Sequence, residues 1–211
     1  MENLYAMNCD KFTAELASKA PVPGGGGASA MCGALAASLC AMAGNLTAGK
    51  KKYAAYENDI QRMLTDCENL RLRFLELINE DASAFEPLSR AYSKSKDDPD
   101  YTAVMREATL AAAAVPYEIM KCCCTAIELL EEMAEKCSVL MVSDVGCGAA
   151  IADAALKAAA LNVLVNTRTL PNDIDAQTME QGAERMLSEY SARAEKITVD
   201  ITDKLRRKNN G

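Results

Sequence analysis

Residues 21–48 read PVPGGGGASAMCGALAASLCAMAGNLTA, and this stretch decides the fold. The two prolines end any preceding helix, and the four glycines that follow predict an irregular loop. From residue 28 to residue 48 the sequence is small or apolar on nearly every face, which is typical of a helix enclosed by closely packed neighbours. We therefore expect a glycine-rich loop and then the central helix of an all-α fold.

The rest of the chain repeats apolar residues at helical spacing and almost lacks strand-like alternation. Further helices are expected over 10–19, 53–93, 101–136, 145–168 and 174–207. Pro116 is expected to kink or divide the helix over 101–136. The sequence thus predicts an antiparallel bundle of about six helices in a single domain over 1–211. Ala-rich apolar helices in excess of one small core also predict a homodimer.

Charge and hydropathy exclude several classes of partner. The chain has 23 basic and 30 acidic residues, a formal charge of -7, and no basic face interleaved with aromatic residues. We therefore expect no nucleic-acid partner. No uninterrupted apolar run approaches the roughly 20 residues of a membrane span, and the N-terminus lacks the pattern of a signal peptide. These features predict a cytoplasmic protein with no membrane association.

Histidine is absent and cysteine is abundant, with nine residues. The absence of histidine excludes Ser/His and Cys/His nucleophilic systems, so acid-base chemistry falls to Asp, Glu, Lys, Tyr, Cys or ordered water. Most cysteines lie among small or apolar residues and are interpreted as reduced packing residues. The consecutive residues Cys122, Cys123 and Cys124 point about 100° apart on a helix and cannot share one ion. No metal site is expected.

Asp81 is the strongest single candidate for a catalytic residue. It interrupts the apolar stripe of the helix over 53–93, three residues after Ile78 and four before Phe85. A charge has no reason to lie there if the stripe only packs. In the alternative interpretation, Asp81 lies just off the stripe and is solvated or paired with a lysine.

The glycines Gly24, Gly25, Gly26 and Gly27 immediately precede a helix. Their unhindered N–H groups and the positive end of the helix dipole could face an anion or a carbonyl oxygen. The spacing matches neither the P-loop nor the dinucleotide-binding fingerprint. The alternative is a flexible turn that lets a tightly packed helix begin.

Lys50, Lys51 and Lys52 follow the other end of the same helix, where cations complement its dipole. One of them could instead bind a carboxylate. Since a helix of 21 residues is about 31 Å long, the glycines and these lysines of one subunit cannot hold the same small ligand. An antiparallel dimer could bring them together.

Three polar residues stand out near and within the helix over 145–168. Asp144 is a candidate catalytic carboxylate or, with Ser143, a cap for the helix start. Asn162 and Asn166 share one face and could present amides to a polar heterocycle or bridge helices. Asp144 and Asn162 lie at the same azimuth but about 27 Å apart, so they cannot touch one reacting atom in one subunit.

Five collinear segments of the chain resemble the cyclodeaminase/cyclohydrolase family, which includes the C-terminal domain of formiminotransferase-cyclodeaminase. Together they span about residues 8–206. They are PVPGGGGASAMCGALAASLCAMAGNLTAGKKKY at 21–53, NEDASAF at 79–85, AAVPYEIM at 113–120, SDVGCGAAIADAAL at 143–156 and LNVLVNT at 161–167.

The resemblance implies an all-helical dimer that binds a tetrahydrofolate derivative in a cleft near the subunit interface, with no further cofactor. Two reactions are implied: hydrolysis of 5,10-methenyltetrahydrofolate to the 10-formyl form, and cyclodeamination of 5-formiminotetrahydrofolate with release of ammonia. Because no formiminotransferase domain precedes the first helix, we expect the hydrolysis. A non-catalytic helical dimerisation domain is the alternative outside enzymes.

Both reactions need a carboxylate to stabilise a cationic amidinium and move protons, a part that suits Asp81 or Asp144. Folate also carries glutamate carboxylates. Lys50, Lys51 or the glycine amides could hold these, while Asn162 and the Asp144 region could hydrogen-bond the pterin edge. Asn166 is a further candidate for substrate binding.

Overall fold

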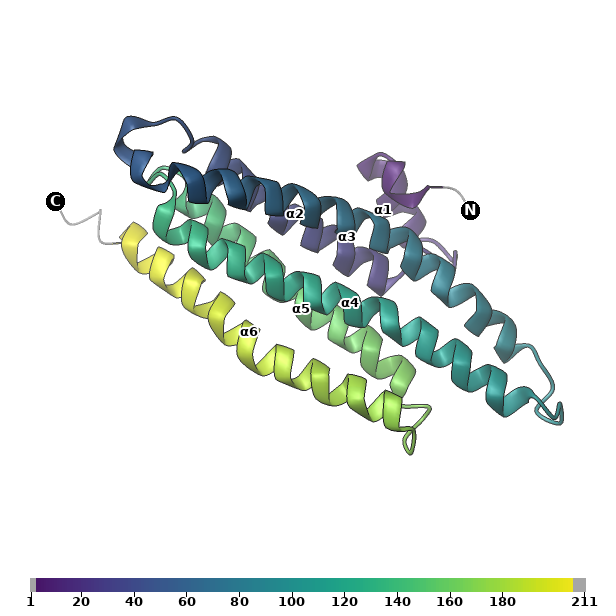
Figure 1. The fold of residues 1–211 in the computed structure, drawn as a ribbon. Coiled ribbons are helices and arrows are strands. Elements are labelled where there is room, and N and C mark those ends of the chain that lie inside the picture. The colour runs from purple at the N-terminus through teal and green to yellow at the C-terminus, as the bar shows by residue number, and fades with distance from the viewer. Residues whose placement is uncertain (1–2, 207–211) are drawn as a thin grey trace.

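The computed structural model describes residues 3–206, and within them the chain is all-helical, with six α-helices and no strand (Figure 1). Short 3₁₀ helices, η1 (Leu4–Ala6) and η2 (Lys51–Tyr56), precede α1 and α3. The α-helices are α1 (Cys9–Leu16), α2 (Gly25–Asn45), α3 (Glu57–Tyr92), α4 (Tyr101–Lys136), α5 (Val142–Thr167) and α6 (Ile174–Arg206). The expected fold class and the number of helices are confirmed, whereas the single domain over 1–211 extends beyond the described residues and stays a prediction.

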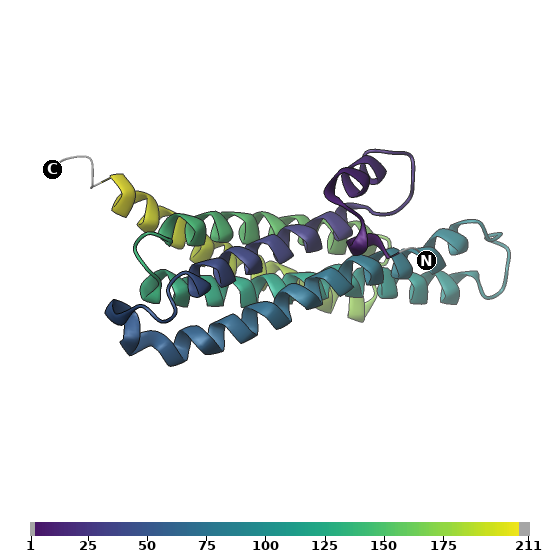
Figure 2. The ribbon, with the colours of Figure 1, turned by 90° about the horizontal axis from the view of Figure 1, so that it is seen from above.

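Helices α2 to α5 form an antiparallel four-helix bundle, and α6 packs along α4 and α5. Helix α1 stands outside the bundle, near the start of α2 (Figure 2). At the same end, α3 and α4 extend as a hairpin past the other helices (Figure 2). The hairpin has a small core of its own, made by Leu88, Ala91, Ala108 and Ala112. The start of α2 is therefore surrounded by several elements.

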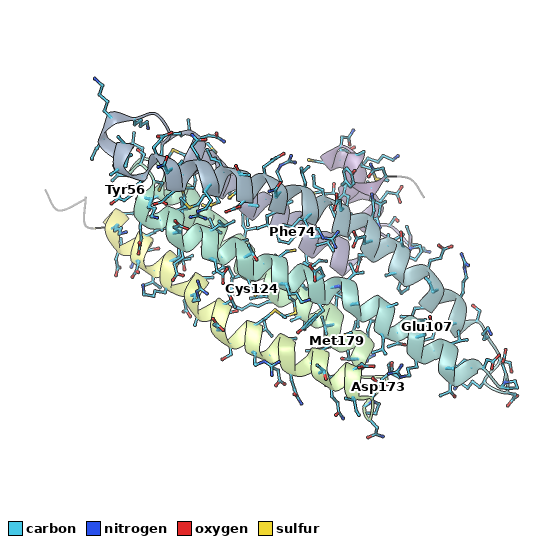
Figure 3. All side chains as sticks on the ribbon, in the orientation of Figure 1. Tyr56, Phe74, Glu107, Cys124, Asp173 and Met179 are labelled. Atoms are coloured by element: carbon cyan, nitrogen blue, oxygen red, sulfur yellow. The ribbon has the colours of Figure 1, made fainter. Side chains whose placement is uncertain are left out.

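Glycines inside the helices let the bundle pack closely. A Cβ at Gly33 of α2 would lie 2.3 Å from Cε1 of Phe74, whose side chain is fully buried on α3. A Cβ at Gly148 of α5 would lie 2.7 Å from Leu130 of α4. Figure 3 shows Phe74 at the middle of α3, while charged residues such as Asp173 lie at the periphery. The close neighbours expected around the small-residue helix are thus present.

The predicted loop over residues 21–27 includes three residues that are helical in the structure. The structure places Gly25, Gly26 and Gly27 in the first turn of α2, with Gly24 as N-cap. Glycine disfavours helix by about 1 kcal/mol relative to alanine, but side chains from two other helices pack against these glycines and exclude a larger residue. Tertiary packing therefore overrides local propensity, and α2 runs over Gly25–Asn45 instead of 28–48.

Other helix ends also differ from the expectation. Helix α1 ends at Leu16 instead of residue 19, and η2 occupies the expected first turn of α3. Helix α5 begins at Val142 with Met141 as N-cap and no side-chain cap, so the capping role of Ser143 or Asp144 was wrong. Pro116 does not divide α4, which is one helix of 36 residues. The predicted end of the last helix, at 207, lies outside the described residues.

Three helices, α2, α4 and α5, are long and apolar enough to cross a membrane by length and composition alone. None of the three is an uninterrupted apolar run in the sequence, because polar residues occur within each one. Helices α2 and α5 also expose apolar side chains, which together we name the α2–α5 face; its large members are Leu35, Met42, Leu161, Leu164 and Val165. No charged residue occurs within α2 itself.

Candidate active site

A cavity of about 190 Å³ lies where α2 begins. The loop before α2, α2 itself, α3, α4 and α5 all contribute to its wall. The lining residues are Pro21, Val22, Gly24, Gly25, Gly26, Asp81, Phe85, Ala112, Asn162, Val165 and Asn166. Six of the ten residues predicted to act in catalysis or binding therefore meet in one cavity, although they are spread over 143 positions of the sequence.

Asp81 of α3 is held against the first turn of α2. Its Oδ2 accepts a hydrogen bond of 3.0 Å from the Gly27 N–H. A Cβ at Gly26 would lie 2.1 Å from Oδ1, so the carboxylate occupies the space of the missing side chain. No ion pair of Asp81 occurs within residues 3–206, which contradicts the lysine-paired alternative. Gly27 does not line the cavity but positions the carboxylate through this hydrogen bond.

Burial raises the pKa of Asp81 to about 6, and the Gly27 N–H opposes part of that increase. Desolvation disfavours the charged carboxylate, while the hydrogen bond favours it. A carboxyl group with a pKa near 6 can both accept and donate a proton near neutral pH. This is the property that an acid-base catalyst needs in a site without histidine.

Asn162 and Asn166 lie one turn apart on α5, and both line the cavity. The Asn162 Nδ2 donates to Ala158 O at 2.8 Å, in the preceding turn. The Asn166 Nδ2 donates to Asn162 O at 2.9 Å and to Ala112 O of α4 at 3.3 Å. Asn166 thus bridges two helices, one of its two predicted roles. With both Nδ2 groups engaged, the side-chain oxygens remain available as acceptors.

The first turn of α2 adds hydrogen-bond donors to these acceptors. The N–H groups of Gly25 and Gly26 donate to no atom of the described residues, as expected for the first positions of a helix. A Cβ at Gly25 would lie 3.0 Å from both Asn162 side-chain polar atoms. Glycine is therefore required for Asn162 and Asp81 to approach the helix. The cavity combines a titratable acid, amide oxygens and free N–H groups.

Lys50, Lys51 and Asp144 lie elsewhere. The lysines follow α2 at its C-terminal end, and α2 is about 31 Å long. Asp144 lies in the first turn of α5, 18 residues before Asn162 and hence about 27 Å away. Within one subunit, these three residues cannot act on a ligand that Asp81 touches.

The sequence did not indicate the apolar wall of the cavity. Phe85, one turn after Asp81, was interpreted as part of the packing stripe, yet it lines the cavity. Its position four residues after the flagged carboxylate was the available signal, because residues i and i+4 share a helix face. Pro21, Val22 and Val165 carry no comparable signal.

A larger surface hollow, of about 510 Å³, lies between α3 and α4 and is less suited to chemistry. It contains Arg62, Arg73 and Glu132. Arg62 binds Glu132 at 2.6 Å and Asp66 at 3.1 Å, so its charge is already neutralised. In addition, no three His, Cys, Asp or Glu side chains of residues 3–206 converge on a possible metal position. The expectation of no metal stays a prediction.

Comparison with known proteins gives a consistent result. The sequence model of formiminotransferase-cyclodeaminase matches residues 8–185. A methenyltetrahydrofolate cyclohydrolase from Methylorubrum extorquens is 37% identical over 200 residues, which cover 93% of this chain and 96% of that protein. A formimidoyltransferase-cyclodeaminase from Rattus norvegicus is 24% identical over 92% of this chain, which spans only 36% of that protein's length.

A solved structure resembles the fold. The crystal structure of formiminotetrahydrofolate cyclodeaminase from Thermotoga maritima matches with a TM-score of 0.83 and 26% identity, over 93% of this chain and 98% of that one. The match therefore includes the bundle and the helices that build the cavity. By family model, sequence identity and fold, this chain belongs to the formiminotransferase-cyclodeaminase family.

Proposed function

We propose that this chain is a methenyltetrahydrofolate cyclohydrolase, which hydrolyses 5,10-methenyltetrahydrofolate to 10-formyltetrahydrofolate. The observation that carries the proposal is the Asp81 carboxyl group, held by Gly27 in a cavity that Asn162, Asn166 and the glycines at the start of α2 also line. The 37% identity to a cyclohydrolase of nearly the same length supports this choice between the family's reactions.

In the proposed mechanism, Asp81 accepts a proton from the water that attacks the carbon between N5 and N10. The resulting tetrahedral carbon carries a hydroxyl group. Its bond to N5 then breaks: protonated Asp81 gives its proton to N5, and the hydroxyl proton leaves to solvent. One proton is released overall, the product is the 10-formyl compound, and Asp81 ends ionised as it began.

The polar wall suits the other end of the same substrate. A pterin ring presents N–H donors on one edge and a carbonyl oxygen beside them. The side-chain oxygens of Asn162 and Asn166 can accept from the donors, while the N–H groups of Gly25 and Gly26 can donate to the carbonyl. Phe85 and Val165 supply an apolar surface for the ring.

Cyclodeamination of 5-formiminotetrahydrofolate is the second candidate, favoured by the structural match to the Thermotoga enzyme. Here N10 attacks the protonated formimino carbon, and Asp81 moves the N10 proton to the amino group, which leaves as ammonia. The two reactions share a tetrahedral carbon flanked by N5 and N10, so one carboxyl group serves both.

We further propose that the enzyme is a cytoplasmic homodimer with no nucleic-acid partner, metal or additional cofactor, and that a second copy covers the α2–α5 face. A bilayer is a poorer match for the apolar helices. Helix α4 is joined to α3 by Lys136–Asp59 and to α6 by Arg193–Glu131, each at 2.6 Å, so charged side chains flank it.

Antiparallel α2 helices of two copies would also bring Lys50, Lys51 and Asp144 toward the other copy's cavity. Sedimentation without detergent tests this: a monomer would contradict it.

An absorbance assay tests the proposed activity and separates the two reactions. The 5,10-methenyl compound absorbs where the formyl and formimino compounds do not, so its concentration can be followed directly. With the methenyl compound as substrate, we expect enzyme-dependent loss of this absorbance. Its enzyme-dependent appearance from 5-formiminotetrahydrofolate alone would instead establish the cyclodeaminase. Neither change, in protein with the expected helical spectrum, would contradict both enzyme proposals.

A further inference from the structure

None of the described residues that line the cavity is positively charged, although the proposed substrate carries negative charges. Folates end in glutamate, and Asp81 is the one charged residue in the lining set. The whole chain has a formal charge of -7, so its long-range field repels an anion. If the proposed function holds, on which this inference rests, cations outside the cavity must attract the glutamate end.

The small volume of the cavity indicates that these cations lie at its mouth. Sites for ligands of drug size usually measure roughly 300–1,000 Å³, and this cavity measures about 190 Å³. It can accommodate the pterin end but not an entire folate. The p-aminobenzoyl group then leads out of the cavity and carries the carboxylates to its rim.

Most cations of the adjoining elements already have acidic partners. Arg90 pairs with Glu86, and Lys94 pairs with Asp98. Arg106 of α4 pairs with both Asp173 and Asp175 at the start of α6. Lys50 and Lys51 are a helix length away within the subunit and would reach this cavity only from a second copy. These pairings narrow the choice of a cation for a ligand carboxylate.

Two exposed cations beside the cavity have no ion pair within the described residues. Arg168 is the C-cap of α5, two residues after Asn166 and three after Val165, both of which line the cavity. Lys19 lies two residues before Pro21, so their Cα atoms are at most about 7 Å apart. The two residues belong to separate chain segments, each of which contributes lining residues to the cavity. We propose that Arg168, assisted by Lys19, binds the glutamate carboxylates of the folate substrate.

Arginine suits this task because its planar guanidinium can bind a carboxylate through two parallel hydrogen bonds. Arg168 therefore sets selectivity for folates over glutamate-free pterins. It does not take part in the chemical step, since the carboxylates lie on the far side of the p-aminobenzoyl group from N5 and N10. The expected signature is a change in KM with little change in kcat.

The test compares 5,10-methenyltetrahydrofolate with 5,10-methenyltetrahydropteroate, which lacks glutamate, in the wild type, Arg168→Gln and Lys19→Gln. Loss of one charge-assisted hydrogen-bonded contact is expected to raise KM for the folate about tenfold in Arg168→Gln, with a smaller increase in Lys19→Gln. KM for the pteroate and both kcat values should stay unchanged. Arg185→Gln is the matched control, because Arg185 is exposed on α6, which does not line the cavity.

The inference is overturned if Arg168→Gln leaves KM for the folate unchanged, or raises KM equally for both compounds. Calorimetry with unreactive tetrahydrofolate and tetrahydropteroate separates this result from a failure of the proposed function. If neither methenyl compound is turned over, binding of tetrahydrofolate weakened by Arg168→Gln still supports the carboxylate site. If turnover is intact and KM for the folate does not change in Arg168→Gln, only the carboxylate site is contradicted, and the proposed function stands.

Discussion

The two ends of α2 contain similar residue types but differ in whether their polar groups have partners. At the C-terminal end, the buried Thr47 hydroxyl donates to Ala43 O at 2.7 Å and accepts from the Ser138 N–H at 2.8 Å. Gly49, with φ of 73°, donates its N–H to Glu57 at 2.9 Å. At the N-terminal end, by contrast, Gly25 and Gly26 line a cavity, and their N–H groups donate to no atom of the described residues.

This difference distinguishes polar groups that stabilise the fold from polar groups that are available to a ligand. Buried polar groups in proteins are normally hydrogen-bonded, so a saturated cluster needs no explanation beyond folding. A cluster that leaves donors, acceptors and a carboxyl group of raised pKa around a cavity is prepared for a ligand. Substitutions at the cavity end should therefore change catalysis, and those at the saturated end should change stability.

The largest effect is expected from Asp81→Asn. The amide keeps an oxygen for the Gly27 N–H but cannot accept a proton, so kcat should fall about 10²- to 10⁴-fold. Steady-state kinetics on the methenyl compound measure the change. Asp66→Asn is the matched control, an exposed carboxylate on the same helix, and it should retain wild-type kcat. Full activity in Asp81→Asn would remove Asp81 from the mechanism.

Gly26→Ala should have the next largest effect. The new Cβ would lie 2.1 Å from Asp81 Oδ1 and must displace the carboxylate. A shift of about 1 Å in a catalytic group can lower kcat/KM by roughly 100-fold. Gly146→Ala in α5 is the control, since its Cβ would meet Ile201 at 3.3 Å, far from the cavity. Equal activity in the two variants would contradict the described fit of Asp81 to α2.

Asp81→Asn should also stabilise the protein in a pH-dependent manner. Burial raises the folded-state pKa of Asp81 from 3.8 to about 6, so its protonation favours folding. That contribution is complete below the unfolded pKa and is lost as pH rises through 6, where the buried charge costs at most about 3 kcal/mol. The variant should therefore exceed the wild type in unfolding free energy at pH 8 but match it near pH 4. Urea titrations at both values measure this, and a difference independent of pH would contradict it.

The smallest effect is expected at the saturated end, from Thr47→Val. The substitution keeps the shape but leaves the buried Ser138 N–H without its acceptor, which should cost about 1–3 kcal/mol of unfolding free energy. The kcat value should not change. In the exposed control Thr125→Val, a shift of less than about 0.5 kcal/mol is expected. A loss of kcat in Thr47→Val without a loss of stability would show that the contrast between the two ends is wrong.

The sequence was sufficient for the helices and for Asp81, because both depend on periodicity. The carboxylate was recognised as an interruption of an apolar stripe, and the structure places it in the cavity wall. The start of α2 was predicted three residues late because glycine argues locally against helix. Only tertiary contacts explain the helical glycines. Asp81 packs against Gly26, which is 55 positions away in the sequence, and Asn162 packs against Gly25, which is 137 positions away.

The position of a candidate residue in the sequence does not show at which end of the bundle it lies. Lys51 is nearer to the glycines along the chain than Asp81 is, yet α2 carries it to the opposite end. Asp144 and Asn162 occur on one helix with the same azimuth, and still lie about 27 Å apart. Which helix ends meet is determined by the antiparallel packing of α2 to α5, a property of the tertiary structure.

The contact between Gly26 and Asp81 also has a consequence for how relatives of this chain diverge. An aspartate at position 81 and a side chain at position 26 exclude each other, because both would fill one volume. The two positions should therefore change together during evolution. A family member that has lost the carboxylate is free to acquire alanine at position 26, and this paired change would mark a chain that has kept the fold while abandoning the reaction.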